Sequence, residues 1–364
     1  MKTIYTKYIL PGLLFQSIII GGGYGTGREI VEFFLSKGPV GGYLGILIAM
    51  LIWSLVMAVG FELARQEKLY DYRTFVRSLL GRGWVLFEVV YIANVILSAA
   101  VVGSASGELL NEIFGWPKLV GTMIMVMVVG YLVFRGSSLI EKVLSAWSIT
   151  LYVAYLIIII AAFSRFGEPI MQWIGDFDSE SSWLKGGFQY AAYNLAALPA
   201  ILFVARHFER RKEAIIAGLL SGPLAMLPAV FIFTAMLSQY PDILQEAIPA
   251  NFLMEQFNWP IFLLFFQIIL FGTFIETGTG MIHGFNERIA GVYRERNEKM
   301  PAIMRLYIAI AILVIAVFLA DQLGLIQLIS KGYGYITWAF WLVFLIPLLL
   351  LGTRKIFSSS SESE

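Results

Sequence analysis

A run of five glycines interrupts the first long apolar segment of this chain. Residues 21–27 read GGGYGTG and are followed directly by Arg28 and Glu29, whereas residues 8–20 and most of residues 30–35 are apolar. Glycine weakens helices, so we expect the helix to break about halfway across a bilayer. Backbone that is not helical at that depth is tolerated only where it is buried in protein or lines a wet cavity. The interruption therefore predicts the binding site of a transporter.

The composition predicts a membrane protein. Hydrophobic residues make up 59% of the 364 residues and charged residues only 14%, against about 25% charged in soluble domains. The net charge of +1 argues against nucleic acid as a partner. The absence of cysteine excludes disulfides and cysteine-based metal sites. The expected partners are a small-molecule solute and membrane lipid, and a homo-oligomer is compatible with the sequence.

Ten apolar segments have the length of about 20 residues that a membrane span needs. They are residues 9–35, 41–63, 84–108, 118–134, 139–163, 186–207, 213–238, 260–287, 302–320 and 327–352. With the N-terminus inside, twenty of the 26 lysines and arginines fall on the inner side and five on the outer side. This asymmetry follows the positive-inside rule. It predicts a multi-pass protein of a bacterial inner membrane with both termini in the cytoplasm.

The ten segments divide into two halves of opposite orientation. Residues 1–164 hold the first five spans, 165–185 an outer connecting loop, 186–352 the last five spans and 353–364 a polar cytoplasmic tail. The second half also opens with a suspect helix, YAAYNLAALP at residues 190–199, in which Asn194 and Pro199 bracket an unwound stretch. Broken helices at corresponding positions of inverted halves are typical of secondary transporters.

These features resemble the LeuT-fold transporters of the amino acid–polyamine–organocation superfamily. The string GGGYGTGREIVEFF is similar to the first-helix motif GAGFASGQEI of the YkvI-like bacterial membrane proteins, with Arg28 in place of a glutamine. The resemblance implies an all-α LeuT fold with ten transmembrane helices, a 5+5 inverted repeat, and broken helices 1 and 6. It also implies a moving bundle of spans one, two, six and seven against a scaffold of spans three, four, eight and nine, with substrate between spans one, three, six and eight.

The glycine run supplies the first candidate binding residues. A helix that restarts there presents free N–H groups and partial positive charge, which suit a carboxylate. Arg28 adds a permanent charge that can bind a carboxylate bidentately. Close helix packing is the alternative for the glycines. An outer gate, or pairing with Glu29 or Glu32, is the alternative for Arg28. The candidates here are Gly23, Tyr24, Gly25, Thr26, Gly27 and Arg28.

Spans three and six add polar candidates, and the start of span ten adds a gate. Asn94 and Ser98 share one helical face with Tyr91, and Tyr190, Tyr193 and Asn194 precede the second break. Hydrogen bonding between helices is the alternative for the two asparagines. Tyr24, Tyr190 and Tyr193 offer rings to a cationic or apolar end of the cargo. Lys331 and Tyr333 are candidates for a gate with Glu29, and glycine-mediated packing is their alternative.

Glu276 is the main candidate for cation coupling. A carboxylate in mid-membrane is costly and is a functional hypothesis by default. The resemblance implies a cation site between spans one and eight, where Thr273, Thr277 and the carbonyls of Ile20 and Gly21 offer oxygen ligands. Either H⁺ or Na⁺ is allowed, and a hydrogen bond between helices is the alternative for Glu276. Lys142 in span five is a candidate stand-in for sodium, with snorkelling to the interface as its alternative.

Together the sequence predicts a secondary active transporter without a cofactor, coupled to H⁺ or Na⁺. Its expected cargo is a small zwitterion or carboxylate such as an amino acid, with a betaine or quaternary amine as the alternative. A channel or a non-transporting sensor of the same fold is the second alternative. The chain lacks HExxH, GxGxxG and GxxxxGK[ST] motifs, so neither an enzyme nor an ATP-driven pump is expected. The lone residues His207 and His283 are interpreted as structural.

Overall fold

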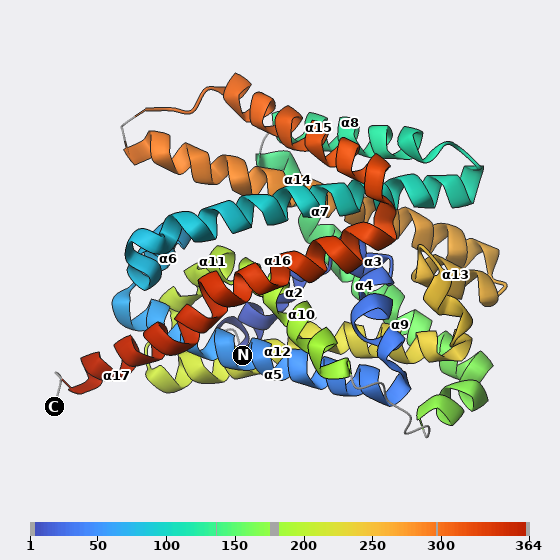
Figure 1. Ribbon diagram of the computed structural model, residues 1–364, viewed down its shortest axis with the longest axis horizontal. Helices are drawn as coiled ribbons and strands as arrows, with labels where there is room; N and C mark the ends of the chain where they lie inside the picture. Colours follow the sequence, from blue (N-terminus) through green and yellow to red (C-terminus); the bar gives the residue numbers. More distant parts are fainter. Residues whose placement is uncertain (1–3, 136, 175–181, 296–297, 362–364) are drawn as a thin grey trace.

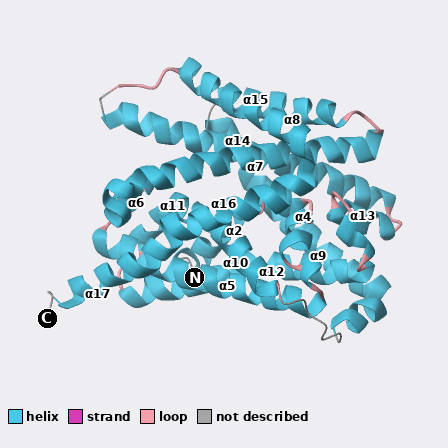
Figure 2. Cartoon of the chain, viewed as in Figure 1, coloured by secondary structure: helices cyan, strands magenta, loops and turns pink. Residues whose placement is uncertain are grey.

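The computed structural model is helical, and Figures 1 and 2 show rods joined by short loops, with no strand in the part of the chain described. It describes residues 4–135, 137–174, 182–295 and 298–361. The first half contains α2 (Leu10–Ile19), α3 (Gly22–Gly25), α4 (Arg28–Phe33), α5 (Pro39–Glu67), α6 (Tyr72–Leu80), α7 (Trp84–Phe114), α8 (Lys118–Arg135) and α9 (Ser137–Ile174). The second half contains α10 (Trp183–Asn194), α11 (Leu198–Ile201), α12 (Arg211–Met236), α13 (Pro249–Gln256), α14 (Pro260–Glu295), α15 (Ala302–Gln327), α16 (Gly334–Phe340) and α17 (Thr353–Ser361).

Two groups of helices form the body of the molecule. In one group α5 packs along α12 and α10, and α12 also packs on α2. In the other, α7 packs along α15, α8 and α14. Figure 1 shows the second group lying above the first, with α3 and α16 between them. The short helix α3 contacts both α7 and α14, so the interrupted first segment lies where the two groups meet.

Small residues allow α5 and α12 to approach closely. A methyl group added at Gly218 would clash with the backbone of Ala58, and one added at Gly222 would clash with the hydroxyl of Ser54. The Ser54 hydroxyl donates a hydrogen bond of 2.8 Å to the carbonyl of Leu219 on the facing helix. Small residues and hydroxyls of this kind are typical of helix contacts in lipid, where apolar surface gives no drive to associate.

The first interruption spans Ile20 to Gly27. Helix α2 ends at Ile19, Gly21 is extended (φ −115°, ψ −164°), and α3 forms one turn before Gly27 takes a left-handed conformation (φ +77°). Only glycine adopts such a φ at little cost. The Thr26 hydroxyl donates to the Gly23 carbonyl over 2.8 Å and accepts from the Arg28 N–H over 3.2 Å. The Thr26 side chain therefore supplies hydrogen-bond partners to two backbone groups of the interrupted segment.

The second interruption, Leu195–Ala197, is milder. Helix α10 ends at Asn194, a 3₁₀ turn follows, and α11 begins with Pro199 in its first turn. Leu195 and Ala197 keep right-handed helical angles (φ −68°, ψ −9° and φ −76°, ψ −19°). Proline is tolerated in a first turn because its missing N–H would have no partner there.

Seven helices of the described residues are long and apolar enough to cross a membrane. The first segment is in short pieces, and Lys118–Val133 falls below the usual length. Ile303–Ser358 runs through both of the last two predicted segments, although Gly324 has non-helical angles (φ +67°, ψ 169°) inside it. The count of ten spans and the division into two inverted halves therefore remain predictions.

Two predicted boundaries differ from the structure. Helix α9 continues to Ile174 with non-helical angles at Phe166, so the first part of the predicted connecting loop is helical. Pro169 lies three residues beyond that kink, where a restarting helix accommodates it, and Ile170 is buried. The tail beyond residue 352 continues as α17, where the Lys355 ammonium donates to the Ser78 carbonyl over 2.9 Å.

Candidate functional site

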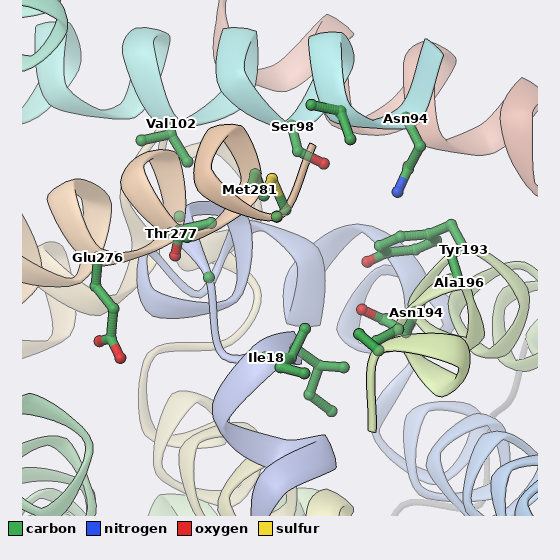
Figure 3. Close-up of a pocket in the computed structure, with 18 of the residues that line it drawn as sticks. Ile18, Asn94, Ser98, Val102, Tyr193, Asn194, Ala196, Glu276, Thr277 and Met281 are labelled. Atoms are coloured by element: carbon green, nitrogen blue, oxygen red, sulfur yellow. The ribbon is translucent and has the colours of Figure 1, made fainter. Parts of the chain in front are cut away.

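A cavity of about 580 Å³ lies beside both interruptions. Helices α2, α3 and α4 supply one wall, α7 and α14 supply the facing walls, and residues from α10 to α11 close the rest (Figure 3). It is lined by Ser17, Ile18, Ile19, Gly21, Gly22, Glu29, Tyr91, Asn94, Val95, Ser98, Val102, Tyr193, Asn194, Ala196, Ala197, Ala200, Glu276, Thr277, Gly280, Met281, Gly284 and Tyr333. Pockets of this size hold small organic molecules.

One end of the cavity carries a chain of polar contacts centred on Glu29. The Tyr193 hydroxyl donates to Glu29 Oε2 over 2.6 Å. The Tyr193 ring stacks on the Tyr333 ring with centroids 4.3 Å apart and planes 5° from parallel. The Tyr333 hydroxyl in turn donates to Ser98 Oγ over 3.0 Å. These contacts tie α4, α10, the turn before α16, and α7 together at one place.

Asn94 adds a polar group that the described residues leave unsatisfied. Its side chain is 9% exposed and its Oδ1 atom has no hydrogen-bond partner in the described part of the chain. Figure 3 shows the amide nitrogen of Asn94 pointing into the cavity from α7, on the same side as Ser98. This side chain therefore offers the cavity a hydrogen-bond donor.

Glu276 and Thr277 lie at the other end of the cavity, on α14 (Figure 3). A methyl group added at Gly21 would lie 3.2 Å from Thr277 Oγ1, so the extended backbone of the first interruption passes directly beside α14. The Thr277 hydroxyl donates to the Thr273 carbonyl over 2.9 Å, which leaves its oxygen lone pairs able to accept or ligate. The Thr277 hydroxyl and the Gly21 backbone therefore lie side by side here, and Glu276 lines the cavity from the preceding position of α14.

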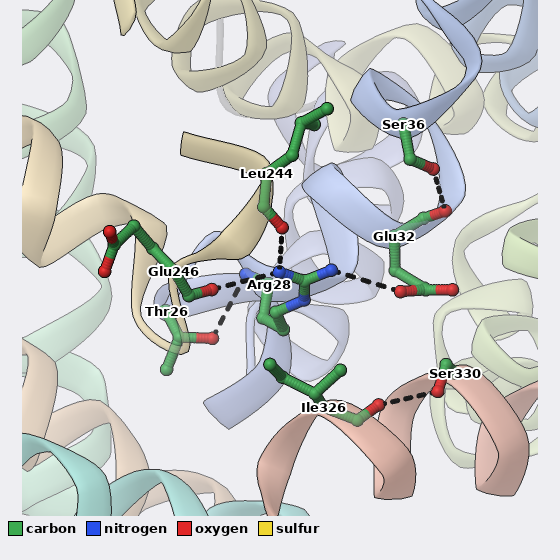
Figure 4. Close-up of polar contacts among 8 residues, drawn as sticks. All are labelled: Thr26, Arg28, Glu32, Ser36, Leu244, Glu246, Ile326 and Ser330. Carbon is green, nitrogen blue, oxygen red and sulfur yellow. Dashed lines mark hydrogen bonds and ion pairs between the residues drawn. The ribbon is translucent and has the colours of Figure 1, made fainter. Parts of the chain in front are cut away.

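Arg28 does not line the cavity. Its Nη1 donates to the carbonyls of Leu244 and Glu246 over 2.8 and 3.0 Å, and its Nη2 pairs with Glu32 over 3.2 Å (Figure 4). The expected contact between Arg28 and substrate is therefore not prepared in this conformation and remains a prediction. The Arg28 guanidinium points to Leu244 and Glu246, whereas Glu29 lines the cavity. The predicted pairing of Arg28 with Glu32 is present.

Further candidates lie in the protein interior rather than at the cavity. Tyr24 packs against Tyr155 with ring centroids 6.1 Å apart, and Tyr190 makes an edge contact with Phe34 at 4.8 Å. The Thr273 hydroxyl donates to the Ile269 carbonyl and is fully buried. The remaining candidates that are buried but do not line the cavity are Ile20, Gly23, Gly25, Thr26 and Gly27.

Two basic candidates do not contribute to the site as described. Lys331 is exposed, and its Nζ lies 3.5 Å from Gln327 Oε1 on the preceding turn, so its expected gate contact with Glu29 is absent. Tyr333 instead reaches Glu29 indirectly, through the stacked ring of Tyr193. The side chain of Lys142 lies outside the described residues, and its expected role remains a prediction.

The charged side chains that line the cavity are acidic, whereas the sequence analysis expected the basic residue Arg28 to face the substrate. Glu29 and Glu276 are the charged side chains among its described lining, which includes no lysine, arginine or histidine. Sequence reasoning placed Glu29 at a gate and missed Val102 and Met281 as lining residues. Tyr91, which helical spacing placed on one face with Asn94 and Ser98, lines the cavity.

Comparison with known proteins supports the resemblance read from the sequence. No profile of a known protein family matches the chain. The uncharacterized membrane protein YkvI of Bacillus subtilis (strain 168) is 25% identical over 339 residues, covering 90% of this chain and 92% of YkvI. The resemblance to YkvI-like proteins is confirmed.

Solved structures share the fold. MhsT, solved in complex with L-phenylalanine, has a TM-score of 0.58 at 15% identity and covers 95% of this chain and 96% of its own. The manganese transporter of Eremococcus coleocola, solved with an aromatic bis-isothiourea compound, has a TM-score of 0.57 at 14% identity, covering 98% and 86%. The chain is thus an all-helical membrane protein whose fold resembles that of LeuT-fold transporters.

Proposed function

We propose that this protein is a secondary active transporter that works by alternating access and carries a small organic solute such as an amino acid. The observation that carries the proposal is the 580 Å³ cavity, which lies between two packed helix groups and beside both interruptions. Non-helical backbone in a membrane protein belongs at such a cavity. The fold shared with MhsT and with a manganese transporter supports the same reading.

Contacts around Arg28 support a state that is closed on the outer side. Besides the Arg28 hydrogen bonds to Leu244 and Glu246, the Ala250 N–H donates to the Thr26 carbonyl over 2.9 Å. The segment Asp242–Gln256, which we call the outer lid, is thereby fastened to the first interruption. In the predicted topology this lid faces the outside of a bacterial inner membrane, which supports the assignment of an inward-facing state.

The lining of the cavity extends in the opposite direction. It continues along Ser17, Ala200 and Gly284, which lie toward the predicted cytoplasmic ends of spans one, six and eight. Cargo would enter and leave along this path in the inward-facing state. Ten spans in a 5+5 inverted repeat, with both termini in the cytoplasm, complete the proposed topology.

The cluster of Glu276, Thr277 and Gly21 is the proposed place for the coupling ion. A carboxylate beside hydroxyl and backbone oxygens suits either a proton on Glu276 or a sodium ion, whose preferred ligands are oxygens. Thr273 and Ile20 lie outside the cavity and have no direct part in this proposal. Coupling requires that ion binding and cargo binding favour the same conformational change.

Proteoliposomes provide the test. Protein reconstituted in liposomes loaded with unlabelled amino acids should accumulate a labelled amino acid by counterflow, with uptake that saturates. Uptake driven by a proton or sodium gradient then identifies the coupling ion. Flux that neither saturates nor exchanges would instead indicate a channel, and binding without any flux would indicate a sensor.

Cysteine labelling tests the assigned direction of opening. The chain has no natural cysteine, so Ser17→Cys gives a single reactive thiol on the predicted inward path. It should react with an impermeant maleimide added from the cytoplasmic side and should be protected from the outer side. Labelling from the outer side only would contradict the inward-facing assignment.

A further inference from the structure

We propose that Glu29 binds a protonated amine, so that the cargo is an ammonium-bearing solute, either a cationic amine or a zwitterion, and not a simple organic anion. The inference rests on the proposed transport function and narrows its substrate class. It departs from the sequence reading, which assigned Glu29 to a gate and expected Arg28 to select a carboxylate. Three observations on the cavity carry it.

The first observation is the balance of charge. Both charged side chains in the described lining, Glu29 and Glu276, are acidic. Arg28 is the nearest basic residue in the sequence, and three acceptors outside the cavity hold its guanidinium. A buried carboxylate needs a partner, and the described residues offer Glu29 no cation. A cationic group on the cargo would supply one.

The second observation is how firmly Glu29 is positioned. It is 4% exposed and receives one hydrogen bond, from the Tyr193 hydroxyl to Oε2. Its Oε1 packs against Gly23 so closely that a methyl group added there would clash with it. Among the described contacts Oε1 has no hydrogen-bond donor. The glycine of the first interruption thus makes room for a carboxylate with one oxygen left to accept from a ligand.

The third observation is the chemistry around that oxygen. The Ser98 hydroxyl, whose oxygen accepts from Tyr333, adds a second polar oxygen to the same cavity. The stacked rings of Tyr193 and Tyr333 form an aromatic wall beside Glu29. Acceptors next to aromatic rings suit an N–H-rich cation, because rings attract cations and acceptors need donors. An organic anion would meet repulsion from Glu29 and Glu276.

The affinity of matched probes for the full-length protein in detergent tests this inference. We choose two sets of the same size that differ in charge: phenethylamine, L-phenylalanine and 3-phenylpropanoate, and isoamylamine, L-leucine and 4-methylpentanoate. Ligands that bind the folded state raise the apparent melting temperature in proportion to their affinity. We expect the amine or the amino acid of at least one set to stabilise the protein, and neither carboxylate to do so.

Variants then assign the effect to Glu29. Glu29→Gln keeps the shape but removes the charge, and should weaken binding of the stabilising probe by roughly 30-fold or more. Glu67→Gln is the matched control, because Glu67 accepts a hydrogen bond from the Ser78 hydroxyl over 2.6 Å and lies away from the cavity and the outer lid. It should leave probe binding unchanged. Tyr193→Phe, which removes the donor to Glu29 and keeps the ring, should weaken binding several-fold.

The outcomes separate this inference from the proposed function. The inference would be overturned if the carboxylates stabilise the protein, if manganese(II) chloride alone stabilises it, or if none of the amine probes does. Unchanged binding of the stabilising probe to Glu29→Gln would also overturn it. If Glu29→Gln does not fold, Glu29→Asp decides, since it keeps the charge but withdraws the carboxylate and should bind amines more weakly. If carboxylates show counterflow and amines do not, the inferred substrate class is refuted but the proposed transport function stands. If amines bind but no solute shows counterflow, the inferred binding of amines stands but the proposed transport function is refuted.

Discussion

The two interruptions differ in how far the backbone departs from a helix. In the first, Gly21 is extended and Gly27 is left-handed, so the chain changes direction twice within seven residues. In the second, every residue from Leu195 to Ala197 keeps right-handed angles, and the helix only tightens into a 3₁₀ turn. The first interruption therefore needs glycine, whereas the second can be made from leucine and alanine.

The two interruptions also contribute different groups to the cavity. The first brings backbone against α14 at Gly21 and makes room for the Glu29 carboxyl at Gly23. Beside the second interruption, the last turn of α10 contributes the side chains of Tyr193 and Asn194. We therefore expect substitutions in the first interruption to disrupt the site and substitutions in the second to adjust it.

The largest effect is expected for Gly25→Leu. A methyl group at Gly25 would already lie 3.1 Å from Leu270 Cδ1 and 3.6 Å from Thr273 Cγ2, so a leucine side chain has no room against α14. Overpacking of this kind costs about 1–3 kcal/mol and would displace α3. Uptake in proteoliposomes should be abolished while expression stays largely intact.

Gly167→Leu is the control for this change. Gly167 lies in α9 with no atom within 4 Å of an added methyl group, so the same substitution should leave uptake near the wild-type rate. Wild-type cargo binding in Gly25→Leu would show that the first interruption tolerates a side chain and would remove the distinction between the two regions.

Glu276→Gln should give the next largest effect, because Glu276 lines the cavity next to Thr277, the residue that packs on the first interruption at Gly21. Glutamine resembles a protonated carboxyl in shape, so cargo binding and counterflow should persist. Accumulation driven by a pH gradient should be lost, and if sodium is the ion, stabilisation by sodium should be lost instead. Unchanged accumulation in both gradients would mean that Glu276 is only a buried hydrogen-bonding group.

Arg28→Lys should loosen the outer lid with a moderate effect. Lysine keeps the charge but lacks the planar fork that reaches Leu244, Glu246 and Glu32 together. Hydrogen bonds to charged groups contribute about 1.5–3 kcal/mol each, so the loss of one should raise lid opening roughly tenfold or more. Ala250 belongs to the outer lid and is buried, so an Ala250→Cys background reports opening of the lid as a faster maleimide reaction from outside.

The comparison also shows what the sequence alone can predict. Five glycines within seven residues, followed by two charged residues, identified the first interruption. Spacing placed Asn94 and Ser98 on one face of α7, and both line the cavity. Glu276 and Thr277, chosen for their depth in an apolar segment, line it as well.

Side-chain direction around the first interruption could not be predicted in this way. The direction of Arg28 and Glu29 depends on the left-handed turn at Gly27, which rotates α4 relative to α3. No periodicity crosses such a turn, so the sequence could not say which of the two charges faces inward. Two of the three acceptors of Arg28 are backbone carbonyls of the outer lid, more than 200 positions away. Because every residue has a backbone carbonyl, the sequence does not show which of them accepts.

The smallest effect is expected for Pro199→Ala in the second interruption. Pro199 occupies the first turn of α11, where a proline removes no helical hydrogen bond, and the 3₁₀ turn before it already has right-handed angles. Alanine should let α10 and α11 join more continuously and change the rate of counterflow by less than about threefold, because helix propensity alone favours alanine there. Initial rates of counterflow in proteoliposomes, compared with those of Gly25→Leu at equal protein content, measure the difference. A complete loss of counterflow in Pro199→Ala would mean that the second interruption is as essential as the first, and that its 3₁₀ turn has to move during transport even though its backbone hardly leaves the helix in this conformation.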